Sequence, residues 1–208
     1  MPPVKDLAQL GQRIAATHGW AAARAFKAYE WDERDRARIA ACASDILKVF
    51  PKGTGHEHAL SAALAVELER RLEAPVHLVA GTLSLDGHPV IGNRLAFDGA
   101  RVFAAEEPSW AGHLWVMVGP HVIDAAIFRI ANSPACAPAL ARHVHSVFGS
   151  ETGLYADHWR RSRRLGLEYE PQYVLSGEDV TRLMATAYRL IAAGSSDVAP
   201  AGDPADRR

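Results

Sequence analysis

The chain has 208 residues, of which 49% are hydrophobic, 8% aromatic and 23% charged. This composition excludes a wholly disordered chain, a collagen and a coiled-coil rod, and it predicts one globular domain with a sizeable core. Lys and Arg number 23 and Asp and Glu number 24, so the net charge of -1 gives no general attraction to nucleic acid or to an anionic membrane.

The cysteine content and the apolar runs indicate a cytoplasmic protein. Cys42 and Cys136 are too few for a disulfide framework or a four-thiolate zinc site, and low cysteine use fits a reducing compartment. The N-terminus lacks an apolar signal core. The most apolar stretch, 114–128, is interrupted by Gly, Pro, His and Asp and is too short to span a bilayer. We therefore expect no membrane partner.

The first third of the chain is predicted to be helical. Apolar residues at helical spacing indicate a helix at 4–18, which Gly19 ends. The Ala-rich segment 20–50 predicts one helix, or two with a break at 31–35. Thr54 is followed three residues later by Glu57, which is the pattern of a capping box and predicts a helix N-terminus at Thr54.

Two strand pairs are predicted next. The segment 76–85 follows Pro75 and reads as a strand, and the Asp86-Gly87 dipeptide after it is typical of a hairpin turn. Residues 92–109 are irregular and polar. A second pair of strands, 113–118 and 121–128, is joined by Gly119-Pro120.

The last part of the chain is predicted to return to helices. A helix at 138–148 precedes Gly149, a mixed segment covers 150–172, and 172–175 could form a strand. Ser176 caps a helix at 177–193. Helices, then strands, then helices indicate an α+β fold in which a central helix packs on a small, mostly antiparallel sheet. We expect one domain over 1–193 and a disordered tail at 194–208.

One pair of ionisable residues is placed together by strand register. With Gly119-Pro120 as the loop, Val118 pairs with His121, so His113, Trp115 and Asp124 share one face of the sheet. His113 and Asp124 are then diagonal neighbours about 7–8 Å apart, a gap that their side chains can bridge. A carboxylate in this position can hold the tautomer of an imidazole and stabilise its charged form.

A capped helix, then the strand LVAGTL, then GHLWVMVGPHVIDAAIF resembles the core of the transglutaminase-like superfamily, which is related to papain-like cysteine peptidases. The family pattern places Cys at a helix N-terminus, the catalytic His on a GHxWV strand and an Asp on the next strand. The resemblance covers about residues 50–130. It assigns the His to His113 and the Asp to Asp124, with Gly112, Trp115 and Val116 matching the flanking residues.

The sequence departs from this pattern at the nucleophile. The family's Cys would lie near Gly55 or His56, where residues 53–58 read Gly-Thr-Gly-His-Glu-His without a thiol. Without a thiol, the ordinary thiolate mechanism has no nucleophile at the expected place.

Two functions from different classes follow. In a hydrolase or acyl transferase acting on amide or ester bonds, His113 would be the general acid/base and Asp124 would orient it. His56, Glu57 or His58 would activate water in place of the Cys, and Trp110 and Trp115 would wall the cleft, with His58 contributing to substrate binding. The alternative is a non-catalytic binding or interaction module on the same scaffold, with a small-molecule or peptide ligand.

Other side chains are given weaker roles. Cys42 lies in an apolar helix stripe and reads as a structural thiol, whereas Cys136 precedes a helix whose dipole would favour a thiolate. One helix histidine with His113 and Asp124 could supply three zinc ligands, but His56 and His58 are two residues apart and point about 200° from each other around a helix. We expect no metal and no cofactor, and a basic run at 159–164 that is a solvated face.

Overall fold

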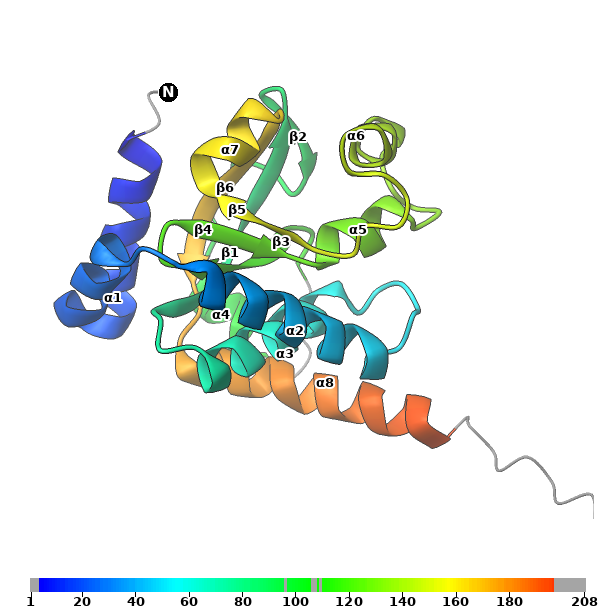
Figure 1. Cartoon of the computed structure of the whole chain (residues 1–208), viewed down its shortest axis with the longest axis horizontal. Helices are drawn as coiled ribbons and strands as arrows, with labels where there is room; N and C mark the ends of the chain where they lie inside the picture. The colour runs from blue at the N-terminus through cyan, green and yellow to red at the C-terminus, as the bar shows by residue number, and fades with distance from the viewer. Residues whose placement is uncertain (1–3, 96, 106–107, 109, 197–208) are drawn as a thin grey trace, which may run out of the picture.

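The computed structural model describes residues 4–95, 97–105, 108 and 110–196. In this part of the chain, six strands form a curled antiparallel sheet with helices on both faces (Figure 1). The predicted α+β class and antiparallel sheet are confirmed. The last helix runs through the first residues of the tail predicted at 194–208, and 197–208 lie outside the described residues.

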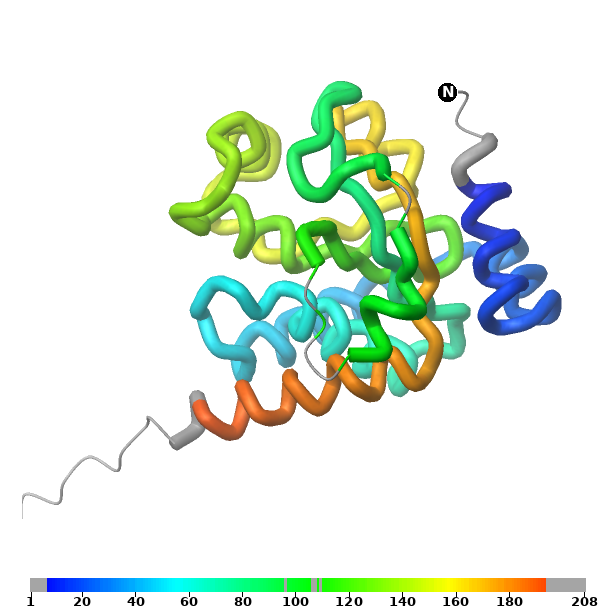
Figure 2. The backbone as a smooth tube through the Cα atoms, turned by 180° about the vertical axis from the view of Figure 1, so that it is seen from behind, coloured from blue at the N-terminus to red at the C-terminus, as the bar shows by residue number. Residues whose placement is uncertain are grey.

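Eight helices lie in the described ranges. They are α1 (Val4–Ala28), α2 (Glu33–Val49), α3 (Glu57–Arg71), α4 (Gly99–Phe103), α5 (Ala126–Ala131), α6 (Pro138–Phe148), α7 (Trp159–Arg164) and α8 (Gly177–Ser196). Helices α3 and α8 pack against each other, and Figure 2 shows from behind that α8 runs along one edge of the molecule while α1 lies at one end.

The strands are β1 (Val76–Leu85), β2 (His88–Ile91), β3 (His113–Val118), β4 (His121–Asp124), β5 (Tyr155–His158) and β6 (Leu167–Val174). Their order is β2-β1-β3-β4-β5, and β6 pairs with β1 as well. The long strand β1 therefore connects all parts of the sheet, because β3 and β2 pair with its two ends and β6 pairs with residues from Val79 to Leu85.

The two faces of the sheet bury separate hydrophobic clusters. Side chains alternate between the faces along β3, so Leu114 and Val116 point to one side, and Trp115 and Met117 to the other. The first cluster packs against α2, α3 and α8, and the second against α1, α5 and α6. The first includes Ile39, Leu60, Leu64, Leu114, Val116, Ile123 and Leu183, and the second includes Leu10, Ile14, Trp115, Met117, Val122, Ile127 and Leu140.

Several predicted boundaries are confirmed. Gly19 has φ 86° and ψ 165°, which interrupts α1 at the predicted stop. The predicted break at 31–35 is also present, because the Asp32 carboxylate accepts from the backbone N–H groups of Arg34 and Asp35 and so begins α2. The strand at 76–85, the Asp86-Gly87 turn and the helix at 138–148 lie where the sequence placed them.

The predicted capping box at Thr54 is wrong. Helix α3 begins at Glu57, and its N-cap residue, His56, makes no side-chain cap hydrogen bond. The Glu57 carboxylate instead accepts from the N–H of Gly55 at 3.0 Å, so it stabilises the preceding turn rather than a helix that begins at Thr54.

The predicted strand at 121–128 is wrong beyond Asp124. The Asp124 Oδ1 atom accepts from the N–H of Ile127 at 3.0 Å, which is the hydrogen bond of a helix start, and α5 follows at once. A local side-chain bond therefore overrides the strand propensity of an Ile- and Phe-containing segment.

Four elements were missed in the segments described as irregular or mixed. Helix α4 is five residues long and is capped by Asp98, which accepts from the N–H of Arg101. Strand β5, helix α7 and most of β6 lie within 150–172. Strand β6 carries Glu168, Glu170 and Pro171 at half-buried positions, and these residues, which are rare in strands, hide its alternation of Leu167 and Tyr169.

Candidate functional site

His113 and Asp124 meet as the strand register predicted. The pairs Val118–His121 and Val116–Ile123 fix the β3–β4 register and bring Asp124 opposite Trp115. The Nε2 atom of His113 lies 2.6 Å from Oδ2 of Asp124. Because a carboxylate only accepts, this bond places the hydrogen on Nε2 and leaves Nδ1 as the second ring nitrogen.

Asp124 has more partners than the sequence indicated. Besides His113 and the N–H of Ile127, its Oδ2 atom accepts from the hydroxyl of Tyr169 at 2.9 Å. One carboxylate therefore joins β3, β6 and the start of α5. A hydrogen-bonded network of this kind stabilises a buried charge, and each donor depends on the same acceptor.

This network is closed to solvent. The side chains of His113 and Asp124 are 1% and 0% exposed. The rings of Trp115 and Tyr169 lie 6.0 and 6.1 Å from the imidazole, measured between centroids. Burial, together with the Asp124 carboxylate, raises the pKa of Tyr169 well above its usual value, so this hydroxyl keeps its proton and acts as a donor.

The start of α3 lies beside the start of β3. Strand β4 ends at Asp124, so its pairing with β3 does not continue as far as Leu114 and Gly112. The carbonyl groups of these two residues therefore have no partner in β4. The His58 Nε2–H donates to the first carbonyl at 3.1 Å, and the Ser61 hydroxyl donates to the second at 2.9 Å. These residues are one helical turn apart on α3 and take the place of a missing strand partner.

The hydrogen bond to the Gly112 carbonyl gives His58 a structural role, whereas the sequence predicted a role in substrate binding. Burial lowers the pKa of His58, and the nearby His113 lowers it further, while the Gly112 carbonyl acts in the opposite direction. His58 is therefore held as a neutral donor next to the His113–Asp124 pair.

His56 and Glu57, the other predicted water-activating residues, lie at the same helix start without joining this network. Glu57 is occupied by the N–H of Gly55, and His56 is the N-cap of α3. Arg129 of α5 donates to the carbonyls of Phe50 and Pro51, which ties the loop before α3 to α5. The structure thus brings His58 close to His113, whereas Glu57 is bonded to the preceding turn and His56 is only the N-cap residue of α3.

Trp110 and Trp115 do not wall a common cleft. Trp110 stacks on Phe97 with ring centroids 4.9 Å apart and packs against the first cluster, whereas Trp115 belongs to the second. Gly81 lies opposite His113 in β1, and a Cβ added there would stand 2.7 Å from the Trp115 indole and 2.0 Å from the carbonyl oxygen of Glu170. The absent side chain lets the indole and β6 lie directly over β1.

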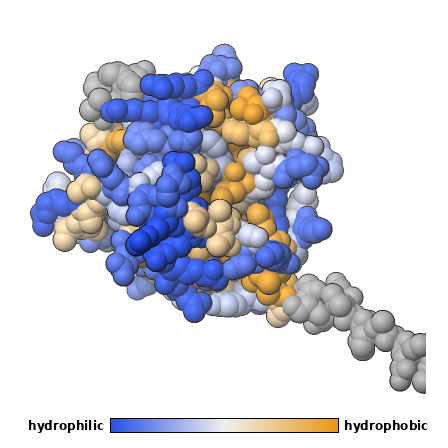
Figure 3. Space-filling model, viewed as in Figure 1, coloured by the Kyte–Doolittle hydropathy of each residue, from blue (hydrophilic) through white to orange (hydrophobic). Residues whose placement is uncertain are grey.

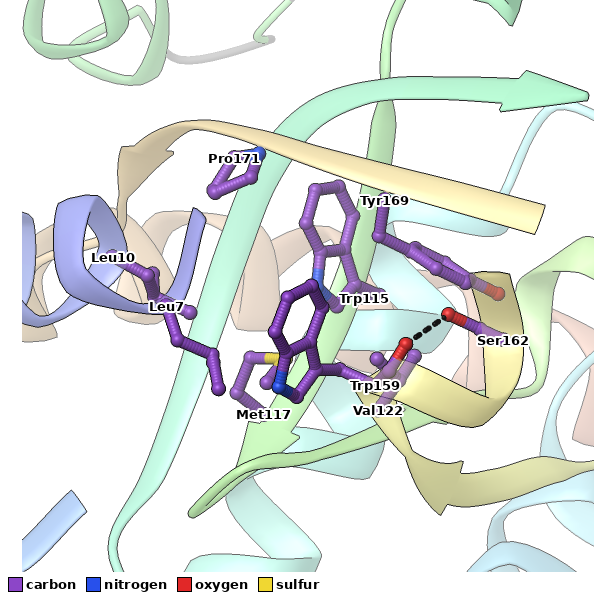
Figure 4. A pocket seen from close by; sticks show the side chains of 9 residues that line it. All are labelled: Leu7, Leu10, Trp115, Met117, Val122, Trp159, Ser162, Tyr169 and Pro171. Atoms are coloured by element: carbon purple, nitrogen blue, oxygen red, sulfur yellow. Dashed lines mark hydrogen bonds between the residues drawn. The ribbon is translucent and has the colours of Figure 1, made fainter. Parts of the chain in front are cut away.

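The cavity that borders Trp115 is too small for a substrate. Its volume is about 20 Å³, which is room for roughly one water molecule. Figure 4 shows it lined by side chains from α1, the sheet and α7. The lining residues are Leu7, Leu10, Trp115, Met117, Val122, Trp159, Ser162, Tyr169 and Pro171.

Both cysteines lie in structural surroundings. Cys42 is fully buried in the first cluster, and its thiol lies 3.9 Å from the carbonyl oxygen of Glu67. Cys136 lies between α5 and α6, where its thiol donates to the carbonyl of Ala137. Burial raises the pKa of both thiols, which opposes the thiolate that a helix dipole would favour at Cys136.

The described residues also hold no group of three or more His, Cys, Asp or Glu side chains that could bind one metal ion. In the basic run, Trp159 is buried rather than solvated, while Arg161 pairs with Asp157 and Arg163 pairs with Glu168. These ion pairs leave the run less available to phosphates than its composition indicated.

Tyr169 is the site residue that sequence reasoning missed. It lies in the segment described as mixed, and only the alternation of Leu167 and Tyr169 marks that segment as a strand. Its contact with Asp124 spans 45 residues of sequence. Strand pairing with β1 had to be known before this partner could be named.

No family model, no curated protein and no solved structure matches this chain. Within the described ranges, none of the helices combines the length and the apolar character that a membrane span requires. The function therefore has to be argued from the geometry of the chain itself.

Proposed function

We propose that the chain is a non-catalytic binding module on a transglutaminase-like scaffold, in which His113 and Asp124 hold the fold together. The observation that carries this proposal is the closure of the pair. Both side chains are at most 1% exposed, and the Asp124 carboxylate already accepts from an imidazole, a phenol and a backbone N–H.

A general acid/base must reach the reacting group within about 2.6–3.2 Å, directly or through one water. Here the imidazole of His113 is packed near Trp115 and Tyr169, and the cavity beyond them holds about 20 Å³. The residues at the expected place of the nucleophile, His56, Glu57 and His58, offer no thiol or hydroxyl. Both the access and the nucleophile that acyl transfer requires are absent from this arrangement of the described residues.

The second candidate is a hydrolase or acyl transferase that uses the same pair. The 2.6 Å bond between His113 and Asp124 favours it, because an oriented imidazole is what general acid/base catalysis needs. His58, whose Nε2 is bonded to the Gly112 carbonyl next to His113, would then position a water molecule through its other ring nitrogen. This candidate requires an opening of the cover over His113.

A turnover assay separates the two candidates. The wild-type protein is incubated with 4-nitrophenyl acetate and with a peptide 4-nitroanilide, next to His113→Asn and the exposed-site control His88→Asn. Exposed imidazoles cleave the activated ester slowly in any protein, so we expect the wild type and both variants to release product at similar low rates that do not depend on His113. A wild-type rate above buffer that His113→Asn abolishes and His88→Asn retains would overturn the proposal, provided that both variants keep the wild-type circular dichroism.

A further inference from the structure

Helix α1 is bent into two arms, and the bend creates a groove. Gly19, with φ 86°, separates residues 4–18 from residues 20–28. A cavity of about 520 Å³ lies between the arms and is closed from the side by Pro120 and Arg160. This volume is within the range of about 300–1,000 Å³ that small-molecule sites occupy. The groove lies away from His113 and Asp124, at the α1 end of the molecule (Figure 1).

The lining of the groove is mainly apolar. Leu7, Ala8, Ala23, Phe26 and Pro120 form apolar parts of its wall. Trp20 also lines it and is 68% exposed, which makes it one of the most exposed large hydrophobic side chains of the described residues. An indole left in solvent at the edge of an apolar groove is a surface that a ligand can cover with a gain in buried apolar area.

The charged side chains of the groove all have one sign. Arg24, Lys27 and Arg160 line it, and none of the Asp or Glu residues from Asp32 onward whose side chains the structure describes does. Trp20, Arg24 and Lys27 are spaced four and three residues apart, so they form one stripe along the second arm of α1. None of the three cations takes part in an ion pair with a side chain between residues 7 and 193 that the structure describes.

We infer that this groove binds a small amphipathic carboxylate, with its apolar body against Trp20 and Phe26 and its carboxylate at Arg24 and Lys27. Charge complementarity favours an anion, and the apolar lining favours a ligand with one charged head rather than a free phosphate. This inference rests on the proposed binding role and names a site for it, but the site shares no residue with the His113–Asp124 network.

The test uses decanoate as the probe and isothermal titration calorimetry on the full-length protein. We expect decanoate to bind the wild type at one site. The double variant Arg24→Gln/Lys27→Gln should weaken binding about tenfold, since each exposed charge contributes a few-fold.

Raising the NaCl concentration from 0.05 to 0.5 M should weaken wild-type binding as well, because salt screens exposed charges. Decanol, which has the same chain without the charge, should bind about tenfold more weakly than decanoate.

The matched control is Arg13→Gln, an exposed arginine of α1 that does not line the groove. It should bind decanoate as the wild type does. Equal affinity in the wild type and the double variant would overturn the inference, as would equal affinity for decanol. Binding to phosphatidylglycerol vesicles without binding to decanoate would also overturn it, because the surface would then recognise a membrane. Decanoate binding and ester turnover are separate assays, so either proposal can fail alone.

Figure 3 shows the α1 end of the molecule from the side of Figure 1, where hydrophobic and hydrophilic residues alternate on the surface. A Trp20→Ala variant provides a second readout, because it removes apolar contact and leaves the three cations in place. It should weaken decanoate binding while keeping the salt dependence of the wild type. Loss of the salt dependence in Trp20→Ala would contradict the assignment of the carboxylate to Arg24 and Lys27.

Discussion

Asp124→Ala is expected to lower the free energy of unfolding by about 3–5 kcal/mol. The substitution removes one acceptor and leaves three donors without it: the imidazole of His113, the hydroxyl of Tyr169 and the N–H of Ile127. All three are buried, so water cannot replace the carboxylate without an opening of the core. Urea unfolding of the wild type and the variant, followed by circular dichroism, measures the difference.

The control for this prediction is Tyr169→Phe, which removes one donor and keeps the carboxylate. It should cost about 1–2 kcal/mol, because one buried hydrogen bond is lost and no charge is left unpaired. An Asp124→Ala variant within about 1 kcal/mol of the wild type would contradict the structural role of the network. Equal losses in the two variants would also contradict it, since Asp124→Ala leaves three donors unpaired and Tyr169→Phe leaves none.

His77→Phe is expected to stabilise the protein at acidic pH and to reduce its acid sensitivity. His77 lies on β1 under α1, with its ring centroid 5.0 Å from that of His18 and 6.0 Å from that of Phe26. Neither of its ring nitrogens has a hydrogen-bond partner among the described residues. Burial, with a contribution from His18, lowers the pKa of His77 from 6.5 to about 4.

The direction of the pH effect follows from this shift. The unfolded chain takes up a proton near pH 6.5, whereas the folded protein resists protonation until about pH 4, so stability falls as the pH falls between these values. The difference between the two pKa values of His77 corresponds to a loss of at most about 3 kcal/mol in the free energy of unfolding. His121, whose pKa burial also lowers to about 4, should retain its own acid sensitivity in the variant.

Thermal unfolding at pH 7.5 and at pH 4.5 measures the effect of His77→Phe. We expect the difference between the two midpoints to shrink in the variant. At pH 7.5 the variant should be at least as stable as the wild type, because phenylalanine leaves no unpaired nitrogen in the apolar site. The exposed His88→Gln is the control and should keep the wild-type difference. A His77→Phe variant with an unchanged pH difference would contradict the account.

The sequence predicted the parts of the fold that local pattern determines. Boundary residues were sufficient for β1, which lies between Pro75 and the Asp86-Gly87 turn, and Gly119-Pro120 was sufficient for the β3–β4 turn. The register of that turn placed His113 beside Asp124. The end of β4 was not predictable from propensity, because Asp124 begins α5 through a side-chain bond to Ile127. Tyr169 was missed because its partner lies far away in sequence.

The closure of the site could not be predicted for a related reason. The cover over the His113 face comes from Trp115, from β6 and from α1, which lie in three distant parts of the chain. Alternation along β3 indicated which face carries His113, but not what packs on that face. The expectation of an open cleft walled by Trp110 and Trp115 followed from this gap, and the two tryptophans lie in different clusters.

The most direct test of the central claim is the reactivity of His113 toward diethyl pyrocarbonate, which acylates accessible imidazole nitrogens. The native protein is labelled briefly at neutral pH and digested, and each histidine is quantified by mass spectrometry. The account predicts that the exposed His88 is modified and that His113 stays unmodified until the protein is unfolded in urea. Modification of His113 in the native protein at a rate similar to that of His88 would contradict a closed structural pair and would favour the hydrolase.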